Sequence, residues 1–177
     1  MAITKINRNF SSIRNAILLL IVVLFSSCKS TPFIEIKENE NAYLISNNNS
    51  FGEIFNENFE SNAIENSLKR FTPTIEEVNQ AENILKLGFK KSNKSKDGRF
   101  ISRNLKDYKR QYLGYINSDG EKMLHISFYL DKNSKKQDNR FWKEEYKMIL
   151  DGGTSYWIAK INLKTNKLEN IAINGVA

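Results

Sequence analysis

The chain has 177 residues, of which 40% are hydrophobic and 27% charged, a composition typical of a globular protein with room for one core. Its formal net charge is +7, but three cations lie before residue 15, so the remainder is only mildly basic and does not imply nucleic-acid binding. One cysteine excludes an intramolecular disulfide, and one histidine leaves a zinc site without its usual ligands, so we expect no cofactor and no metal.

The N-terminus has the order of a secretory signal. Met1 to Arg14 carries three positive charges and no negative one, and an unbroken apolar run follows from Ala16 to Phe25. This run is about ten residues long, whereas a helix that spans a bilayer needs roughly twenty. Two serines then precede Cys28. The pattern predicts a signal peptide over residues 1–27 that is removed from the mature chain.

Small residues directly before a cysteine resemble the lipobox of bacterial lipoproteins, with Leu24 and Phe25 as its apolar part. Phe25 departs from the leucine that is commoner at its position. The resemblance implies that Cys28 is lipidated, as by palmitate, and that residues 28–33 form a tether to a membrane. We expect a location in the bacterial cell envelope, with the outer membrane favoured. The alternative is an uncleaved signal anchor in which the cysteine is a coincidence.

Residues 34–70 are poorly patterned and predict a strand or a short helix. Short apolar stretches occur at Phe33–Ile36 and Tyr43–Ile45, with Asn, Ser and Glu between and after them. From Glu35 to Glu65 there are seven glutamates and one lysine, so this part of the chain is acidic.

Residues 72–87 form the clearest predicted helix. Either Thr72 caps it with Pro73 at the first helical position, or Thr74 and Glu77 form a capping box. Apolar residues recur at helical spacing on one face, namely Ile75, Val78, Ala81 and Leu85.

Gly88 is predicted to end this helix, and Phe89 to Lys106 is predicted to be a basic loop. From Lys86 to Arg110 there are ten basic residues and two acidic ones. The plain interpretation is a solvated loop, or one that faces the acidic segment upstream. The sharper interpretation is attraction to anionic headgroups or glycans near the anchoring membrane.

After residue 107 the hydrophobic period changes to two, which indicates strands. Five segments fit this period: Tyr108–Ile116, Lys122–Leu130, Phe141–Leu150, Tyr156–Leu163 and Leu168–Asn174. Turns are predicted between them at Asn117–Gly120, Asp151–Gly153 and Lys164–Lys167. One apolar face comprises Leu124, Ile126, Phe128 and Leu130, and another comprises Trp157, Ala159 and Ile161.

These elements predict a single α+β domain over residues 34–177. Its main helix would pack on a curved antiparallel meander of about five strands, formed by residues 107–174. In outline this architecture is similar to cystatin-like and NTF2-like domains, and an architecture does not fix a function.

Three residues of the first predicted strand are candidates for ligand binding. Tyr108, Arg110 and Tyr112 share one face, and if the helix left that face uncovered it would form an aromatic and basic concave surface suited to a glycan or peptide. The favoured alternative is that these aromatic residues pack in the core.

His125 is predicted to point away from the apolar face of its strand, on the same side as Met123, Ser127 and Tyr129. A structural or surface role is favoured over a general base, because the sequence fixes no nucleophile or carboxylate beside it. Asp151–Gly153 is interpreted as a turn, since glycine adopts positive φ without strain. Glu144 and Glu145 are adjacent in a predicted strand, so they face opposite sides and cannot form a catalytic pair.

The C-terminal part, roughly residues 105–177, is similar to a family of small uncharacterised lipoproteins of Bacteroidota. The matching pieces are Tyr112-Leu113-Gly114-Tyr115, Gly120-Glu121-Lys122, Trp142-Lys143, Asp151-Gly152-Gly153, Tyr156-Trp157 and Asn174-Gly175-Val176-Ala177. The resemblance agrees with a lipid anchor and implies no assigned activity.

The expected function is that of an envelope-anchored lipoprotein with a non-enzymatic binding or interaction module. No Walker loop, dinucleotide fingerprint, serine elbow or HExxH motif is present. The expected partners are the membrane, through Cys28, and an envelope protein or a glycan. A periplasmic or surface inhibitor or immunity-type protein is the alternative, and an enzyme that depends on carboxylates is the least favoured.

Overall fold

The computed structural model describes residues 33–36, 42–47, 50–130, 146 and 149–175. The predicted signal peptide, Cys28, Glu144, Glu145 and most of the predicted strand Phe141–Leu150 lie outside the described residues. No described helix is both long enough and apolar enough to cross a bilayer.

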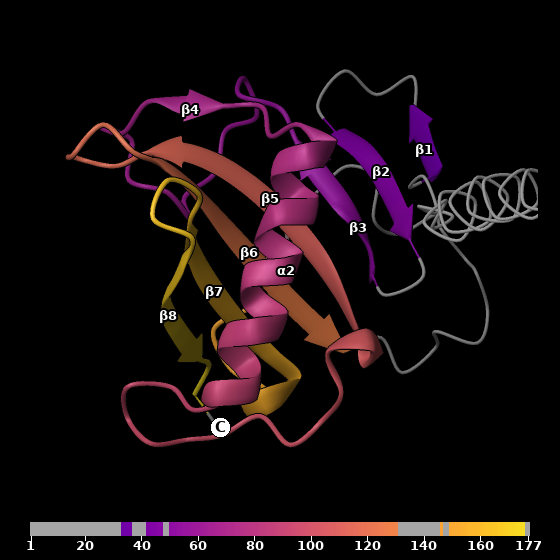
Figure 1. The fold of residues 1–177 in the computed structure, drawn as a ribbon, viewed down its shortest axis with the longest axis vertical. Helices are drawn as coiled ribbons and strands as arrows, with labels where there is room; N and C mark the ends of the chain where they lie inside the picture. The colour runs from indigo at the N-terminus through magenta and orange to yellow at the C-terminus, as the bar shows by residue number, and fades with distance from the viewer. Residues whose placement is uncertain (1–32, 37–41, 48–49, 131–145, 147–148, 176–177) are drawn as a thin grey trace, which may run out of the picture. The chain divides into compact units, whose positions relative to one another are not determined.

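The described residues form one helix on one mixed, mostly antiparallel sheet, which confirms the α+β class (Figure 1). The strands are β1 (Phe33–Ile36), β2 (Ala42–Asn47), β3 (Ser50–Phe55), β4 (Arg70–Phe71), β5 (Tyr108–Ile116), β6 (Lys122–Leu130), β7 (Tyr156–Asn162) and β8 (Lys167–Ile173). Their order in the sheet is β1-β2-β3-β5-β6-β7-β8, with β4 paired to β5. Two short 3-10 helices, Leu105–Asp107 and Gly153–Ser155, lead into β5 and β7.

The prediction of about five antiparallel strands is corrected in two ways. Strands β1, β2 and β3 come from the segment that has little sequence pattern, and β3 pairs with β5 in parallel. Strand β4 pairs antiparallel with the far end of the same edge of β5. Short strands depend on neighbours that are distant in the sequence, so local pattern is a poor guide to them.

The meander of the C-terminal half is confirmed for β5, β6, β7 and β8, which pair antiparallel in sequence order. The prediction that Phe141–Leu150 adds a strand between β6 and β7 is wrong, because β6 pairs directly with β7 from Met123 to Tyr129. The predicted turn at Asn117–Gly120 is present, with Gly120 at φ 74°.

The helix α2 spans Ile75–Lys91, and its start is the predicted capping box of Thr74 and Glu77. The Glu77 amide donates to Thr74 Oγ1 at 3.3 Å, and the Thr74 amide donates to Glu77 Oε2 at 2.9 Å. The prediction that Gly88 ends the helix is wrong, since the helix continues to Lys91. A Cβ at Gly88 would lie 2.7 Å from Leu168 Cδ2, so glycine lets α2 approach β8.

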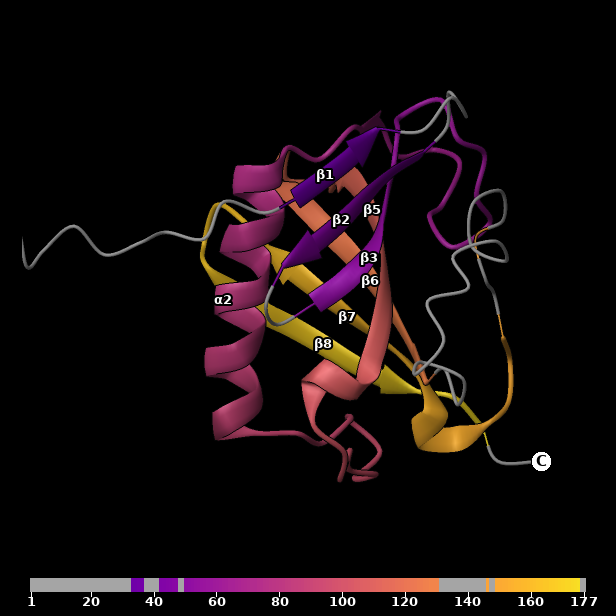
Figure 2. The same ribbon diagram turned by 90° about the vertical axis from the view of Figure 1, so that its right-hand side faces the viewer.

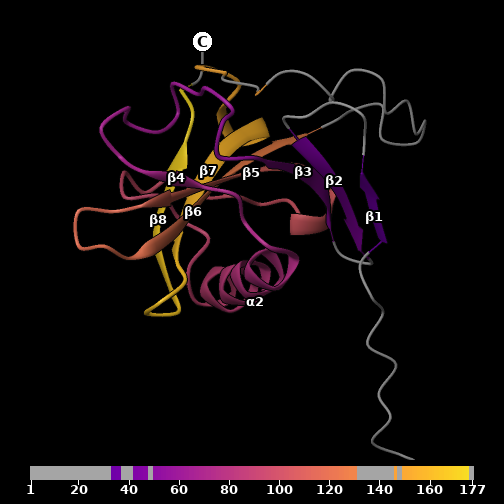
Figure 3. The same ribbon diagram turned by 90° about the horizontal axis from the view of Figure 1, so that it is seen from above.

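The sheet has a core on each face, with α2 on one side and the connection 56–69 on the other (Figures 2 and 3). The larger core lies between α2 and the sheet and includes the two predicted apolar faces, with Leu124, Ile126 and Phe128 on β6 and Trp157, Ala159 and Ile161 on β7. The smaller core lies on the opposite face, where the connection 56–69 covers the sheet, and it includes Phe55, Ile64, Leu113, Tyr115 and Met123. Both faces of the central strands are therefore buried.

Candidate binding pocket

The three residues predicted as a ligand surface are buried in the larger core. Tyr108, Arg110 and Tyr112 do share one face of β5, but each is at most 2% exposed. Tyr108 packs edge-on against the rings of Phe128 and Trp157, with ring centroids 6.4 and 5.5 Å apart. The condition for an open aromatic and basic surface is therefore not met, and these residues serve the core.

Arg110 is a buried cation whose partner lies on α2. Its Nε lies 2.8 Å from Glu82 Oε1, and its Nη1 donates to the Tyr108 carbonyl at 2.7 Å. The Tyr112 hydroxyl donates to the same Glu82 oxygen at 2.9 Å. One carboxylate thus joins the helix to two side chains of β5, and its charge compensates the guanidinium.

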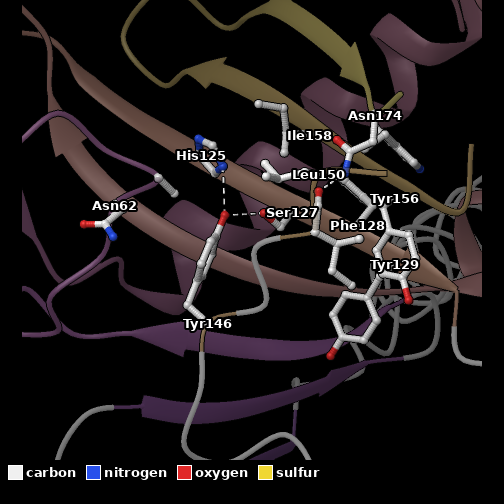
Figure 4. A pocket seen from close by; sticks show the side chains of 13 residues that line it. Asn62, His125, Ser127, Phe128, Tyr129, Tyr146, Leu150, Tyr156, Ile158 and Asn174 are labelled. Carbon is white, nitrogen blue, oxygen red and sulfur yellow. Dashed lines mark hydrogen bonds between the residues drawn. The ribbon is translucent and has the colours of Figure 1, made fainter. Parts of the chain in front are cut away.

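On the opposite face of the sheet, three polar side chains meet. His125 and Ser127 lie two residues apart on β6, so they share a face, as predicted. Tyr146 brings its hydroxyl between them, 2.9 Å from His125 Nε2 and hydrogen-bonded to Ser127 Oγ (Figure 4). We call this set the polar trio. The Tyr146 ring packs edge-on against Phe55, with centroids 5.9 Å apart.

The polar trio is electrically neutral at ordinary pH. Burial, together with the smaller effects of the positive charges of Lys160 and Arg70, lowers the pKa of His125 to about 4. Burial raises the pKa of Tyr146 to about 12, against smaller opposing effects of Ser127 and Arg70. His125 Nδ1 is buried and has no hydrogen-bond partner among the described residues. A neutral phenol, hydroxyl and imidazole can each exchange hydrogen bonds with an uncharged ligand.

The polar trio lies in a half-open pocket of about 290 Å³ over the outer face of β6 and β7 (Figure 4). The described lining residues are Asn62, Ala63, His125, Ser127, Phe128, Tyr129, Tyr146, Ile149, Leu150, Tyr156, Trp157, Ile158 and Asn174. Tyr129 and Tyr156 are cross-strand neighbours whose rings are nearly parallel, at 10°, with centroids 6.3 Å apart. Leu150 is 84% exposed and adds an apolar side chain to the lining.

The described lining contains no Asp, Glu, Lys or Arg, although these types make up 27% of the chain. Its chemistry is that of aromatic and aliphatic surfaces with a few hydroxyl, imidazole and amide groups. Such a site desolvates an apolar face of a ligand and orients it through a few hydrogen bonds. Within the described part of the chain, no cluster of three or more metal-ligating side chains occurs.

The sequence placed His125 and Ser127 on one face but did not connect them with Tyr146. Tyr146 is a single tyrosine after a long charged segment, and nothing in the local sequence indicates where its side chain lies in the folded protein. Only the fold reveals its contact with His125 and Ser127. The predicted turn at Asp151–Gly153 does have left-handed backbone, with φ of 93° at Gly152 and 54° at Gly153. Gly152 also lies close to Tyr156, since a Cβ there would be 2.6 Å from the ring.

Comparisons of this chain with protein-family models, curated proteins and solved structures gave no match. The similarity to small lipoproteins of Bacteroidota therefore stays a prediction from the residues quoted for it.

Proposed function

We propose that the chain is an envelope-anchored lipoprotein whose α+β domain is a non-enzymatic binding module, with the pocket over β6 and β7 as its binding site. The observation that supports binding is that the described lining of this pocket is neutral and aromatic. The observation that supports anchoring is the order of charged residues, apolar run and small residues before Cys28. The helix across one face of the sheet also supports a cystatin-like or NTF2-like outline, which we propose at the level of architecture alone.

The lining favours an uncharged ligand with an apolar face and several hydroxyl or amide groups, and we propose a neutral glycan unit. A sugar ring presents C–H groups that pack on aromatic rings such as Tyr156, and hydroxyls that pair with Asn62 and the polar trio. A charged ligand would lose its hydration without gaining a counter-charge from the described lining, which is unfavourable. A volume of about 290 Å³ lies at the small end of ligand pockets, which suits one or two rings.

A glycan titration tests the binding site. We expect the neutral disaccharide N,N′-diacetylchitobiose to bind the full chain in detergent, measured by saturation-transfer NMR and calorimetry. The deacetylated disaccharide, which carries ammonium groups, should bind at least about tenfold more weakly, because the described lining residues give it no counter-charge. Leu150→Ser should weaken binding of the neutral disaccharide about three- to tenfold, since it removes apolar contact area.

Leu87→Ser is the matched control, because Leu87 is also exposed, at 61%, and lies on α2 outside the pocket. It should leave the affinity for the neutral disaccharide unchanged. Equal affinity for the neutral and the charged disaccharide, or equal effects of the two serine variants, would contradict the proposed site.

Cys28→Ala tests the anchor. The chain expressed in a bacterial host should incorporate radiolabelled palmitate, and the variant should incorporate none, because the thiol is the group that accepts the lipid. Loss of labelling should be accompanied by accumulation of the uncleaved precursor. Palmitate incorporation that is equal in Cys28→Ala and the unchanged chain would refute lipidation at this residue.

A further inference from the structure

A short hairpin follows α2 and forms part of the predicted basic loop, Phe89 to Lys106. Lys94 and Phe100 face each other in an antiparallel bridge. The Ser95 amide donates to the Arg99 carbonyl at 2.8 Å, and the Ile101 amide donates to the Asn93 carbonyl at 2.9 Å. We call residues 93–101 the basic hairpin. Its tip contains Gly98 at φ 86°, a backbone conformation that favours glycine.

The basic hairpin is fixed to the domain at several points. Ser95 and Ile101 are buried, and Ile101 belongs to the larger core. The side-chain amide of Asn93 donates to the Ile101 carbonyl at 2.7 Å. Arg99 pairs with Asp97 and donates to the carbonyl of Asn174, just beyond β8. These contacts fix the backbone of the hairpin. The side chains that do not take part in them therefore face solvent in a defined arrangement.

The side chains that the basic hairpin presents are an aromatic ring and cations. Phe100 is 56% exposed, and two lysines are exposed with it: Lys94, which faces Phe100 before the turn, and Lys96, which lies in the turn. Further exposed cations flank the hairpin at Lys90, Lys91, Arg103 and Lys106. Lys90, Lys91, Lys94 and Lys96 form no ion pair within the described part of the chain. The acidic segment upstream therefore does not neutralise these lysines through contacts among described residues.

We propose that the basic hairpin docks on anionic lipid headgroups, with Phe100 entering the interface between headgroups and acyl chains. Lysines near a membrane surface are attracted by anionic lipids, and an exposed apolar ring gains by leaving water. Phe100 favours a membrane over a nucleic-acid duplex or another polyanion that binds through its charges, because these offer an exposed apolar ring no apolar interior to enter. The inference rests on the proposed lipid anchor, which would hold the domain close to a bilayer at high effective concentration.

Photolabelling in proteoliposomes tests this contact with the full lipidated chain. The vesicles contain phosphatidylethanolamine and phosphatidylglycerol with a trace of photoactivatable phosphatidylglycerol, or phosphatidylcholine with its photoactivatable counterpart. Labelled peptides are then mapped by mass spectrometry. We expect the peptide that contains residues 93–101 to be labelled at least about fivefold more from phosphatidylglycerol than from phosphatidylcholine, and this excess to decline as salt rises.

The triple variant Lys94→Ser, Lys96→Ser and Phe100→Ser should reduce labelling of the hairpin from phosphatidylglycerol at least about tenfold. The matched control is Lys69→Ser with Lys167→Ser, which removes two exposed lysines elsewhere and should leave the labelling unchanged. Circular dichroism of both variants checks that the fold is retained.

Labelling of residues 28–33 reports the anchor separately from the hairpin. A labelled tether with an unlabelled hairpin would overturn the docking proposal and leave the lipoprotein proposal standing. A labelled hairpin with an unlabelled tether would overturn the proposed lipid anchor and leave the contact of the hairpin with anionic lipids standing. Equal labelling of the hairpin from both lipids would also overturn docking on anionic lipids.

Discussion

Replacing Glu82 with leucine should lower the free energy of unfolding by about 3–5 kcal/mol, measured by urea denaturation near neutral pH. Glu82 is the only carboxylate that pairs with Arg110 among the described residues, and the Arg110 side chain is 1% exposed. Without Glu82 the guanidinium keeps its charge under α2, where the 1% exposed side chain has little access to water that could replace the lost partner. The Tyr112 hydroxyl loses its acceptor in the same step.

Two variants show whether this loss comes from the stranded charge. The double variant Arg110→Met with Glu82→Leu should recover most of the stability, because an apolar pair replaces a buried ion pair at little cost. Asn83→Leu places the same new side chain at the next, exposed position of α2 and should change the unfolding free energy by less than about 0.5 kcal/mol. A double variant as unstable as Glu82→Leu alone would show that the charge of Arg110 is not the cause.

A second large effect is expected from pH, through His125. Its pKa is about 4 in the folded chain, because the ring is buried, and about 6.5 in the unfolded chain. The unfolded state therefore binds more protons between these values. The contribution of neutral, buried His125 to the free energy of unfolding is therefore complete above about pH 6.5 and is lost as the pH falls toward about 4. The full difference corresponds to about 3 kcal/mol.

His125→Gln separates this effect from the titration of carboxylates. Glutamine keeps a hydrogen-bonding group near Tyr146 but has no proton to gain, and His125 is the only histidine in the chain. Denaturation by urea at about pH 7.5 and about pH 4.5 should show a smaller loss of stability in the variant than in the unchanged chain. Equal losses in the two chains would mean that His125 is not buried in the neutral form.

The sequence is informative where the pattern is local. The capping box of Thr74 and Glu77 and the alternation of Leu124, Ile126 and Phe128 depend on neighbours a few residues away, and the structure confirms both. Gly88 misleads because a glycine near a predicted helix end has two explanations. Here the reason is a close contact with Leu168, which lies in another element and leaves no mark in the local pattern.

The candidate sites show the same limit. Alternation placed Tyr108, Arg110 and Tyr112 on one face, but alternation cannot say which face the helix covers. The compensating carboxylate, Glu82, lies on α2 and has no sequence signal that links it to β5. The pocket depends on Tyr146, whose position beside His125 follows from tertiary structure alone. Polar residues in apolar strands are therefore a useful signal of a buried polar site. The residues that contact them can be identified only from the fold.

The parallel pairing of β3 with β5 also bears on the order in which the chain can assemble. Gly52 on β3 lies opposite Arg110 on β5, so the N-terminal strands are joined to the rest of the sheet by contacts between distant residues. Strands β5 and β6, and strands β7 and β8, are joined instead by short turns that close quickly. Since synthesis proceeds from the N-terminus, β1, β2 and β3 emerge first and have no strand to complete their sheet until β5 has followed.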